Sequence, residues 1–457
     1  MRTISLVLTT LMIVALSSPH PMEAQAKGGL KGAAAAKEAV KLIKERKPAE
    51  ALKVVEGAKG TFDADEEWVW WGLRGVCLRD MRTKDKDALE SFGKACALQP
   101  DCWFRFDWCL LLHEFGRWDE ALKEIEVEID PDYKELNQCL KAVIDGPFKE
   151  RWPHAWKKLE LRSKFGNYHV VSDTGMTAAQ MDAVETAAKQ LDPTKPADKM
   201  KLDKLLAPHD NLVALAALTE LARKEYMRFV NPKDSDMPKG KVFKVFFFTH
   251  EKDFHEFSAA ASGGRRDSDK MLGFYQPFFH YLQLYHEEGK PSKVCGFSEE
   301  TINTFFHEGW HQFLHMLTDQ LPIWMNEGLA EFLGEASIKD QGRNIELGLL
   351  IRTKEKVYTY YERIRAAIDK GSYVPFKDFF RWDREDWAPN SSLGYMQGWS
   401  IAYYALKGDN DPFRKDFCKF FWECAKGKLA ADVLPGIFTD QKLADYEKAW
   451  KAYWKKM

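Results

Sequence analysis

Residues Thr301–Glu335 read TINTFFHEGWHQFLHMLTDQLPIWMNEGLAEFLGE and contain three histidines and four glutamates. The apolar residues of the first half recur three and four positions apart, which predicts a helix with one buried face. Ser298 is placed to cap that helix, and the two glutamates that follow it suit the N-terminal end of a helix. Pro322 ends the connection, and Ile323–Glu335 then predicts a second helix.

His307 and His311 are four residues apart, so both imidazoles project from one face of the predicted first helix. Two imidazoles at this spacing can hold one zinc ion, and Glu308 then points beside them toward a bound water. The pattern predicts a catalytic site with one zinc ion per chain. A catalytic zinc ion takes three protein ligands, so one more ligand is needed.

The third ligand is expected on the second helix. His315 shares the helical face of the first two histidines, but its backbone lies about 12 Å along the axis from His307. We therefore interpret His315 as a supporting or partly exposed residue outside the ligand set. Glu327 and Glu331 are four residues apart. One of them can bind the ion while the other accepts the free N–H of a ligating histidine.

The composition is that of a globular protein with a weak overall charge. The chain has 457 residues, of which 45% are apolar and 30% are charged, so it can form sizeable hydrophobic cores. Its formal net charge is −2, which gives no support to the binding of nucleic acid or of an anionic membrane. We expect about three domains and no nucleic-acid partner.

The N-terminus predicts export. Arg2 supplies a short positive segment, and Ile4–Leu16 is an apolar core that is shorter than the roughly 20 residues of a membrane-spanning helix. Ala24 and Ala26 are the small residues that a signal peptidase recognises. We expect residues 1–26 to be removed as a signal peptide, with an uncleaved anchor as the alternative. The remaining sequence has no apolar run of 18 residues, so the exported protein, periplasmic or secreted, is expected to lack a membrane segment.

Residues 27–145 predict paired helices. The segments AEALKVV, KDALESF and DEALKEI place their Ala-Leu steps 37 and 33 residues apart, close to the helix-hairpin period of about 34. The middle unit resembles a tetratricopeptide repeat, in which small residues let helices approach and aromatic residues fill the grooves. A plain helical bundle is the alternative. Such a region either binds a protein partner or braces the domain that follows it.

Residues 146–297 predict a small sheet with helical cover. Asn167–Thr174 and Lys241–Phe248 are rich in β-branched and aromatic residues and predict strands. Asn211–Val230 predicts a long helix between them. Alternating strands and helices of this kind indicate the α+β class.

A further strand is expected in Met271–Tyr285, at a sheet edge because Pro277 cannot donate to a strand ladder. Residues 298–457 carry both motif helices and are expected to be almost wholly helical. The fold class that results is helix-rich α+β.

The eight cysteines do not mark the candidate site. Five of them lie between Cys77 and Cys139, and the sequence has no Cys-x-x-Cys pattern. An exported protein permits disulfides. In a chain of this size we favour buried thiols, with one or two bridges in the helical region left open.

The motifs resemble those of the gluzincin metallopeptidases, in which HExxH is followed by a helix carrying Asn-Glu-x-x-x-Asp/Glu. The segments HEGWHQ, LPIWMNEGLAEF and YMQGWS are similar to the peptidase MA-like family of exported bacterial proteins. The resemblance extends over roughly residues 166–410. It implies a thermolysin-like zincin domain with a small mixed sheet and a helical subdomain.

The resemblance also implies roles for individual residues. The implied zinc ligands are His307, His311 and Glu327. Glu308 would be the general base, and Glu331 would accept the free N–H of His307. Tyr395 would donate its hydroxyl to the oxyanion, with simple packing at a helix start as its alternative role. Gly273–Phe278 would be the edge strand along which an extended peptide lies.

The expected function is that of an exported zinc metallopeptidase acting on a peptide or protein substrate. Glu331 stands where thermolysin-like relatives have aspartate, and no exopeptidase anchor is evident, which leaves endo- and exopeptidase action open. One alternative is a binding or scaffold protein that uses its helical repeats and has a catalytically silent zincin domain. Another is hydrolysis of a non-peptide amide.

Overall fold

The computed structural model describes residues 30–82, 84–127, 133–232, 237, 239–263, 271–351 and 359–457. Its helices and small mixed sheets confirm the helix-rich α+β class. The predicted signal peptide lies outside the described residues. Among the residues that are described, no helix combines the length and the apolar character needed to cross a membrane.

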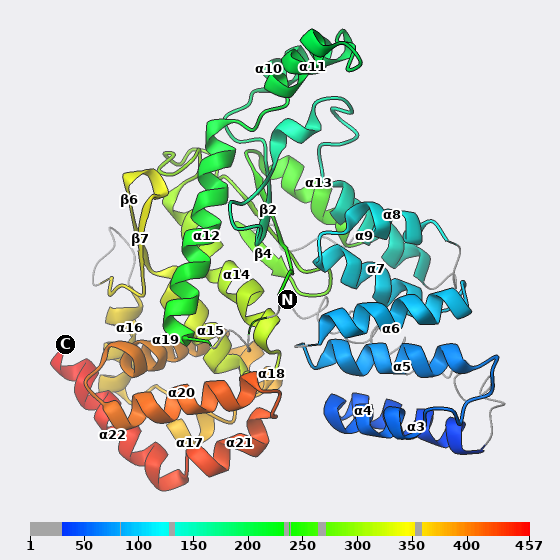
Figure 1. Cartoon of the computed structure of the whole chain (residues 1–457). Helices are drawn as coiled ribbons and strands as arrows, with labels where there is room; N and C mark the ends of the chain where they lie inside the picture. Colours follow the sequence, from blue (N-terminus) through cyan, green and yellow to red (C-terminus); the bar gives the residue numbers. More distant parts are fainter. Residues whose placement is uncertain are drawn as a thin grey trace.

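The N-terminal part is a stack of helices lying side by side, each packed against the next along the chain (Figure 1). The bounds of these helices are α3 (Leu30–Lys44), α4 (Pro48–Gly57), α5 (Glu67–Asp80), α6 (Asp85–Leu98), α7 (Phe104–Glu114), α8 (Trp118–Ile125) and α9 (Lys134–Asp145). The three recurring segments of the sequence all lie in helices, in α4, α6 and α8. Small residues bring neighbouring helices together, since a Cβ atom on Gly72 would lie 1.8 Å from the Phe104 ring.

A five-stranded mixed sheet follows, in the order β1-β2-β3-β5-β4. The strands are β1 (Glu160–Arg162), β2 (Tyr168–Ser172), β3 (Phe243–Phe248), β4 (Gly273–Gln276) and β5 (Tyr281–Tyr285). The central strand β3 is parallel to β2 and to β5, whereas β1 and β4 pair antiparallel at the two edges. Strand β4 therefore has one neighbour in the sheet.

The sheet divides the core into two layers. All six residues of β3 are buried, and they alternate between the two faces. Val245 and Phe247 pack in one cluster with residues of α12 (Asp210–Val230) and α14 (Glu299–Leu317). Phe246 and Phe248 belong to a second cluster, which joins α13 (Glu251–Ala261) to α7 and α9 of the N-terminal stack. The N-terminal helices thus share a hydrophobic core with the sheet.

The segment Met271–Tyr285 differs from its prediction, because it forms a hairpin of two strands and not one strand. Pro277 lacks the N–H that a ladder requires, and His280 adopts a positive φ of 55°, so the chain reverses direction between them. The predicted edge position is confirmed for the first half of the segment, because β4 is an edge strand of the sheet.

The described residues of the C-terminal part are helical except for one hairpin, which no pattern in the sequence predicted. The hairpin pairs β6 (Ala336–Lys339) with β7 (Asn344–Leu347). Asp340 and Gly342 turn the chain with φ values of 51° and 88°. The helices of this part that follow α14 are α15 (Ile323–Gly334), α16 (Tyr360–Lys370), α17 (Phe376–Phe379), α18 (Arg384–Trp387), α19 (Ser391–Lys407), α20 (Asp411–Ala425), α21 (Ala430–Ile437) and α22 (Asp440–Lys456).

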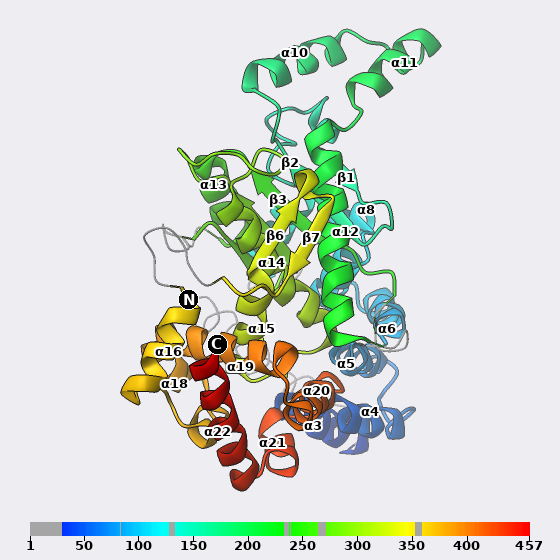
Figure 2. The same cartoon turned by 90° about the vertical axis from the view of Figure 1, so that its left-hand side faces the viewer.

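Two helices stand away from the body of the molecule, α10 (Ala178–Lys189) and α11 (Pro196–Leu205), as Figure 2 shows. Helix α11 has no buried residue. Short 3-10 turns complete the described elements, η2 (Trp156–Leu159), η3 (Asp340–Gly342) and η4 (Ala388–Asn390).

The buried pair Cys96 and Cys102 provides a test of the cysteine interpretation. All eight cysteines are free thiols in the structure, but the Sγ atoms of this pair are 3.8 Å apart. A small side-chain rotation brings them to the roughly 2.05 Å of a disulfide. Mild oxidation is therefore expected to lower the thiol count of the denatured chain from eight to six. In Cys96→Ser the count should stay at seven, and a wild-type count of eight after oxidation would contradict the expectation.

Candidate metal centre

Helix α14 presents the histidines on one face because its opposite face is buried. Ser298 Oγ accepts the backbone N–H of Thr301 and caps the helix, as predicted. Ile302, Phe305 and Phe313 are at most 1% exposed and anchor the buried face in the core beside the sheet. The helical period then directs the HExxH histidines away from that core and toward α15.

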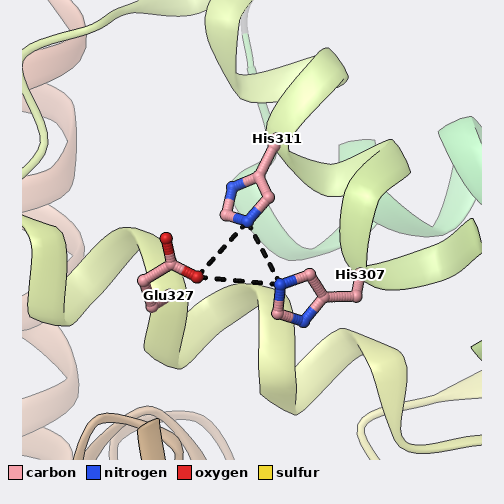
Figure 3. A group of neighbouring side chains, drawn as sticks. All are labelled: His307, His311 and Glu327. Carbon is pink, nitrogen blue, oxygen red and sulfur yellow. Dashed lines mark hydrogen bonds and ion pairs between the residues drawn. The ribbon is translucent and has the colours of Figure 1, made fainter. Parts of the chain in front are cut away.

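Helix α15 brings a third side chain to the two imidazoles (Figure 3). The Nε2 atoms of His307 and His311 are 3.2 Å apart. Glu327 Oε2 lies 3.7 Å from Nε2 of His307 and 3.4 Å from Nε2 of His311. Within the described ranges, this is the group of three metal-binding side chains whose ligand atoms lie within 4.8 Å of one another.

The three separations suit a tetrahedral metal ion. Zinc ligands lie about 2.0–2.2 Å from the ion, so two of them are roughly 3.4 Å apart in a tetrahedral site. The observed separations of 3.2, 3.4 and 3.7 Å are close to that value. Two imidazole nitrogens and one carboxylate oxygen are a donor set found at catalytic zinc sites, where one position stays open for water. The residues therefore fit the ion that the sequence predicts.

Each imidazole has a second polar partner on its far nitrogen. His307 Nδ1 is 3.6 Å from Glu331 Oε1, and His311 Nδ1 is 3.0 Å from Asn326 Oδ1. Acceptors in these positions fix each ring so that its Nε2 atom faces Glu327. Glu331 lies where the resemblance places it. Asn326 was not assigned this role from the sequence, because its position beside a ligand does not reveal its contact with His311.

The neighbouring charges of the centre shift the pKa values of its side chains strongly. Burial by itself lowers the pKa of His307, but its hydrogen bond to Glu327 and the neighbouring carboxylates outweigh burial and raise that pKa to about 9. Burial by itself raises the pKa of Glu327, but the charge of His311 and the hydrogen bonds from both histidines lower it well below its usual value. Imidazolium–carboxylate pairing therefore stabilises this arrangement of the three side chains.

Glu308 is directed toward the same centre from α14. Its Oε1 atom lies 3.9 Å from His307 Nε2, and its Oε2 atom accepts the backbone N–H of Tyr275 at 2.9 Å. One oxygen is therefore anchored on the edge strand β4 while the other faces the ligand atoms. A carboxylate in this position is able to accept a proton from a molecule beside the two imidazoles.

Two tyrosines lie beside the acidic side of the centre. Burial, followed by the charges of Glu327 and Glu331, raises the pKa of Tyr395, so its phenol keeps its proton. Its ring packs edge-on against Trp387 with the centroids 5.2 Å apart. Tyr360, at the start of α16, hydrogen-bonds to the Glu331 carboxylate and was not predicted, since no sequence pattern links the two.

His315 lies outside the ligand group, two turns along α14. Its Nδ1 atom is 2.8 Å from the Tyr275 hydroxyl oxygen, and its ring lies over that of His280 with the centroids 4.7 Å apart. His315 is therefore too far along the helix axis to join His307 and His311, as its position in the sequence predicts.

A close helix crossing places α19 against α15. A Cβ atom on Gly328 would lie 2.4 Å from the backbone oxygen of Gly398, and one on Gly398 would lie 2.7 Å from the backbone oxygen of Trp324. Backbone atoms cannot move aside as a flexible side chain can, so both positions require glycine. The crossing sets Tyr395, on the first turn of α19, near Glu327 on α15.

Residues 301–425 match the model of a domain family described as a protein of unknown function, DUF1570. The matched segment begins in α14 and ends with α20, so it contains the metal-site residues and Tyr395. No curated protein matches the chain with significance.

Gly328→Ala should destabilise the protein, because the added methyl group meets the backbone of α19. We expect its free energy of unfolding to fall by roughly 1–3 kcal/mol, as measured by denaturant titration. Gly436→Ala is the matched control, since a Cβ atom there has no neighbour within 4 Å. Equal stability of the two variants would contradict the close crossing.

Zinc binding should release at least about one proton per ion near pH 7.5, because the His307 pKa of about 9 keeps that ring protonated in the metal-free protein and the His311 pKa is raised as well. The proton stabilises the metal-free fold fully below the unfolded pKa of about 6.5, and this contribution is lost as the pH rises through about 9. Zinc affinity should accordingly increase with pH across this window. Calorimetry in buffers of different ionisation enthalpy measures the release, and a value of zero would contradict the raised pKa.

Proposed function

We propose that this chain is an exported zinc metallopeptidase of the gluzincin type, which hydrolyses a peptide bond in a peptide or protein substrate. The observation that chiefly supports the proposal is the spacing of the three ligand atoms, 3.2–3.7 Å, together with the Glu308 carboxylate directed toward them. The proposed ligands are His307, His311 and Glu327.

When bound, a zinc ion at these ligands supplies Lewis-acid activation of a water molecule and polarisation of the scissile carbonyl. Glu308 then does the proton transfer. Its Oε1 atom accepts a proton from the attacking water and later delivers that proton to the departing amine. The carboxylate therefore ends the reaction in the ionised state in which it began. The hydrogen bond from Tyr275 to Oε2 keeps the carboxylate in place through both transfers.

The edge strand β4 supplies a surface for an extended peptide. Tyr285 donates its N–H to the Leu272 carbonyl, so the alternation of an antiparallel pair directs the backbone polar groups of Gly273 and Tyr275 away from β5. Tyr275 uses its outward N–H to bind Glu308, which places this edge beside the candidate centre. An added substrate strand can therefore pair with the outward groups of Gly273 and with the Tyr275 carbonyl, which brings its scissile bond near the base.

Tyr395 is the proposed donor to the oxyanion. Its phenol keeps its proton because burial and the surrounding carboxylates both disfavour a phenolate. A neutral hydroxyl held near Glu327 can donate a hydrogen bond to the negative oxygen that develops on the scissile carbonyl.

Metal content tests the first half of the proposal. The purified chain, supplied with zinc, should hold one ion, and Glu327→Ala should lose most of it because two imidazoles alone form an incomplete site. If Glu327→Ala retained a full ion, the third ligand would be a different side chain.

Hydrolysis of a peptide library tests the second half. Glu308→Gln should keep its zinc and lose at least about 100-fold in activity, because the amide cannot accept the proton. Glu300→Gln, an exposed glutamate on the same helix, is the matched control and should retain wild-type activity. Full activity of Glu308→Gln with bound zinc would refute the mechanism, and a zinc-loaded wild type that cleaves nothing would refute the function.

A further inference from the structure

We propose that the N-terminal helices position the catalytic base: Glu114 of α7, acting through His280, His315 and Tyr275, fixes the edge-strand amide that binds Glu308. The inference rests on the proposed function, because it assigns these four side chains as positioning residues of that site. It also gives the N-terminal stack a role inside this chain that needs no external partner.

The four side chains form a connection from Glu114 through His280 and His315 to Tyr275. Tyr275 is the end of this connection that contacts the base, Glu308. Its backbone N–H donates to Glu308 Oε2 at 2.9 Å, and its hydroxyl oxygen is 2.8 Å from His315 Nδ1 and 3.4 Å from His280 Nδ1. The residue is therefore held both through its backbone and through its side chain. Movement of the ring would shift the amide that orients the carboxylate.

The middle of the connection is the turn between β4 and β5. His280 has a φ of 55°, a conformation that non-glycine residues rarely adopt and that needs support from its surroundings. Its Nε2 atom lies 3.2 Å from Glu114 Oε1, and Gln312 of α14 donates its side-chain N–H to the His280 carbonyl at 3.4 Å. His113, next to Glu114, places Nε2 3.2 Å from the Phe279 carbonyl oxygen.

The far end of the connection is a buried cluster of charges at the ends of two N-terminal helices. Glu114 is the last residue of α7, and Asp85 is the first residue of α6. Lys241 pairs with both, at 2.7 Å from Glu114 Oε2 and 3.2 Å from Asp85 Oδ2. Glu114 and Asp85 are at most 5% exposed, so the cluster is shielded from solvent and its interactions are strong.

The charge states set the direction of each hydrogen bond. Burial lowers the pKa of His280 to about 4 and that of His315 well below its ordinary value, so both rings are neutral. Burial opposes ionisation of Glu114, but His280 and Lys241 outweigh it and lower its pKa to about 2. His280 Nε2–H therefore donates to the Glu114 carboxylate, and its Nδ1 atom accepts the Tyr275 hydroxyl proton. The neutral His315 ring in turn donates its Nδ1–H to the Tyr275 hydroxyl oxygen.

A second contact holds the C-terminal end of α14. Arg82, which follows α5, donates to the backbone oxygen of His315 and pairs with Asp319 at 3.3 Å. A cation at this end of a helix satisfies carbonyl groups that have no partner within the helix. The N-terminal stack thus contacts the helix that carries the base as well as the strand that orients it.

The position of β4 depends on these contacts because an edge strand has a ladder on one side alone. Its outer side has no strand partner in the sheet, so side chains and turn contacts must fix its place. Displacements of about 1 Å are enough to slow a reaction that requires alignment of a base, a water molecule and a carbonyl. A loosened β4 would therefore reduce turnover while the three metal ligands stay in place.

The test uses the full chain with Glu114→Gln and Tyr275→Phe, each of which removes one link. Tyr446→Phe is the matched control. Tyr446 lies on the remote helix α22, and its hydroxyl also makes a 2.8 Å hydrogen bond, to Asp416 of α20. Hydrogen exchange of the metal-free proteins is measured over residues 272–281. We expect about tenfold faster exchange there in both test variants, with residues 301–317 and the control unchanged.

Steady-state kinetics on the best library peptide complete the test. We expect kcat to fall about fivefold to tenfold in both test variants, with zinc content and KM close to wild type. Exchange rates equal to those of Tyr446→Phe would overturn the proposal, and so would faster exchange with an unchanged kcat. If Glu114→Gln fails to fold, the result for Tyr275→Phe decides whether the proposal stands. This variant removes only one hydroxyl group and is expected to fold. A wild-type protein without peptidase activity would refute the proposed function. The hydrogen-exchange rates alone would then test whether Glu114 and Tyr275 fix the position of β4.

Discussion

The structure depends on the convergence of α14 and α15, which places two imidazoles and three carboxylates in one partly buried site. Such a group is costly to bury unless each polar atom has a partner. The partners are present: Glu327 lies between the two Nε2 atoms, and Glu331 and Asn326 face the two Nδ1 atoms. The glycine crossing of α15 and α19 then closes the site from the other side. A metal ion would replace protons in an arrangement that already exists.

The molecule surrounds this site with three kinds of support. The sheet orients α14 through its buried face, and the edge strand β4 binds the base through a backbone amide. The C-terminal helices supply Tyr395 and Tyr360 next to the carboxylates. The N-terminal helices share a hydrophobic core with the sheet and contact the turn after β4. This continuity favours a bracing role for those helices over that of a separate binding module.

Much of the local architecture is predictable. The helical period alone places His307 and His311 on one face, and it separates His315 from them by two turns. The same period pairs Glu327 with Glu331 on the next helix. The strand β3 and the helix α12 also follow from their apolar patterns and end residues. In each case the pattern extends over neighbouring residues, so that short-range geometry is sufficient to read it.

Other features are decided by contacts between residues far apart in the chain. The sequence by itself determined the helices, the central strands and the order of the candidate ligands. The tertiary structure alone decided that Asn326 supports His311, that Tyr360 meets Glu331, and that the Tyr275 amide binds Glu308. It also decided that β4 and β5 form a hairpin and that Glu114 reaches His280 across 166 positions. The physical reason is that hydrogen bonds and ion pairs act over a few ångströms in space, and local periodicity does not specify which distant segments come that close.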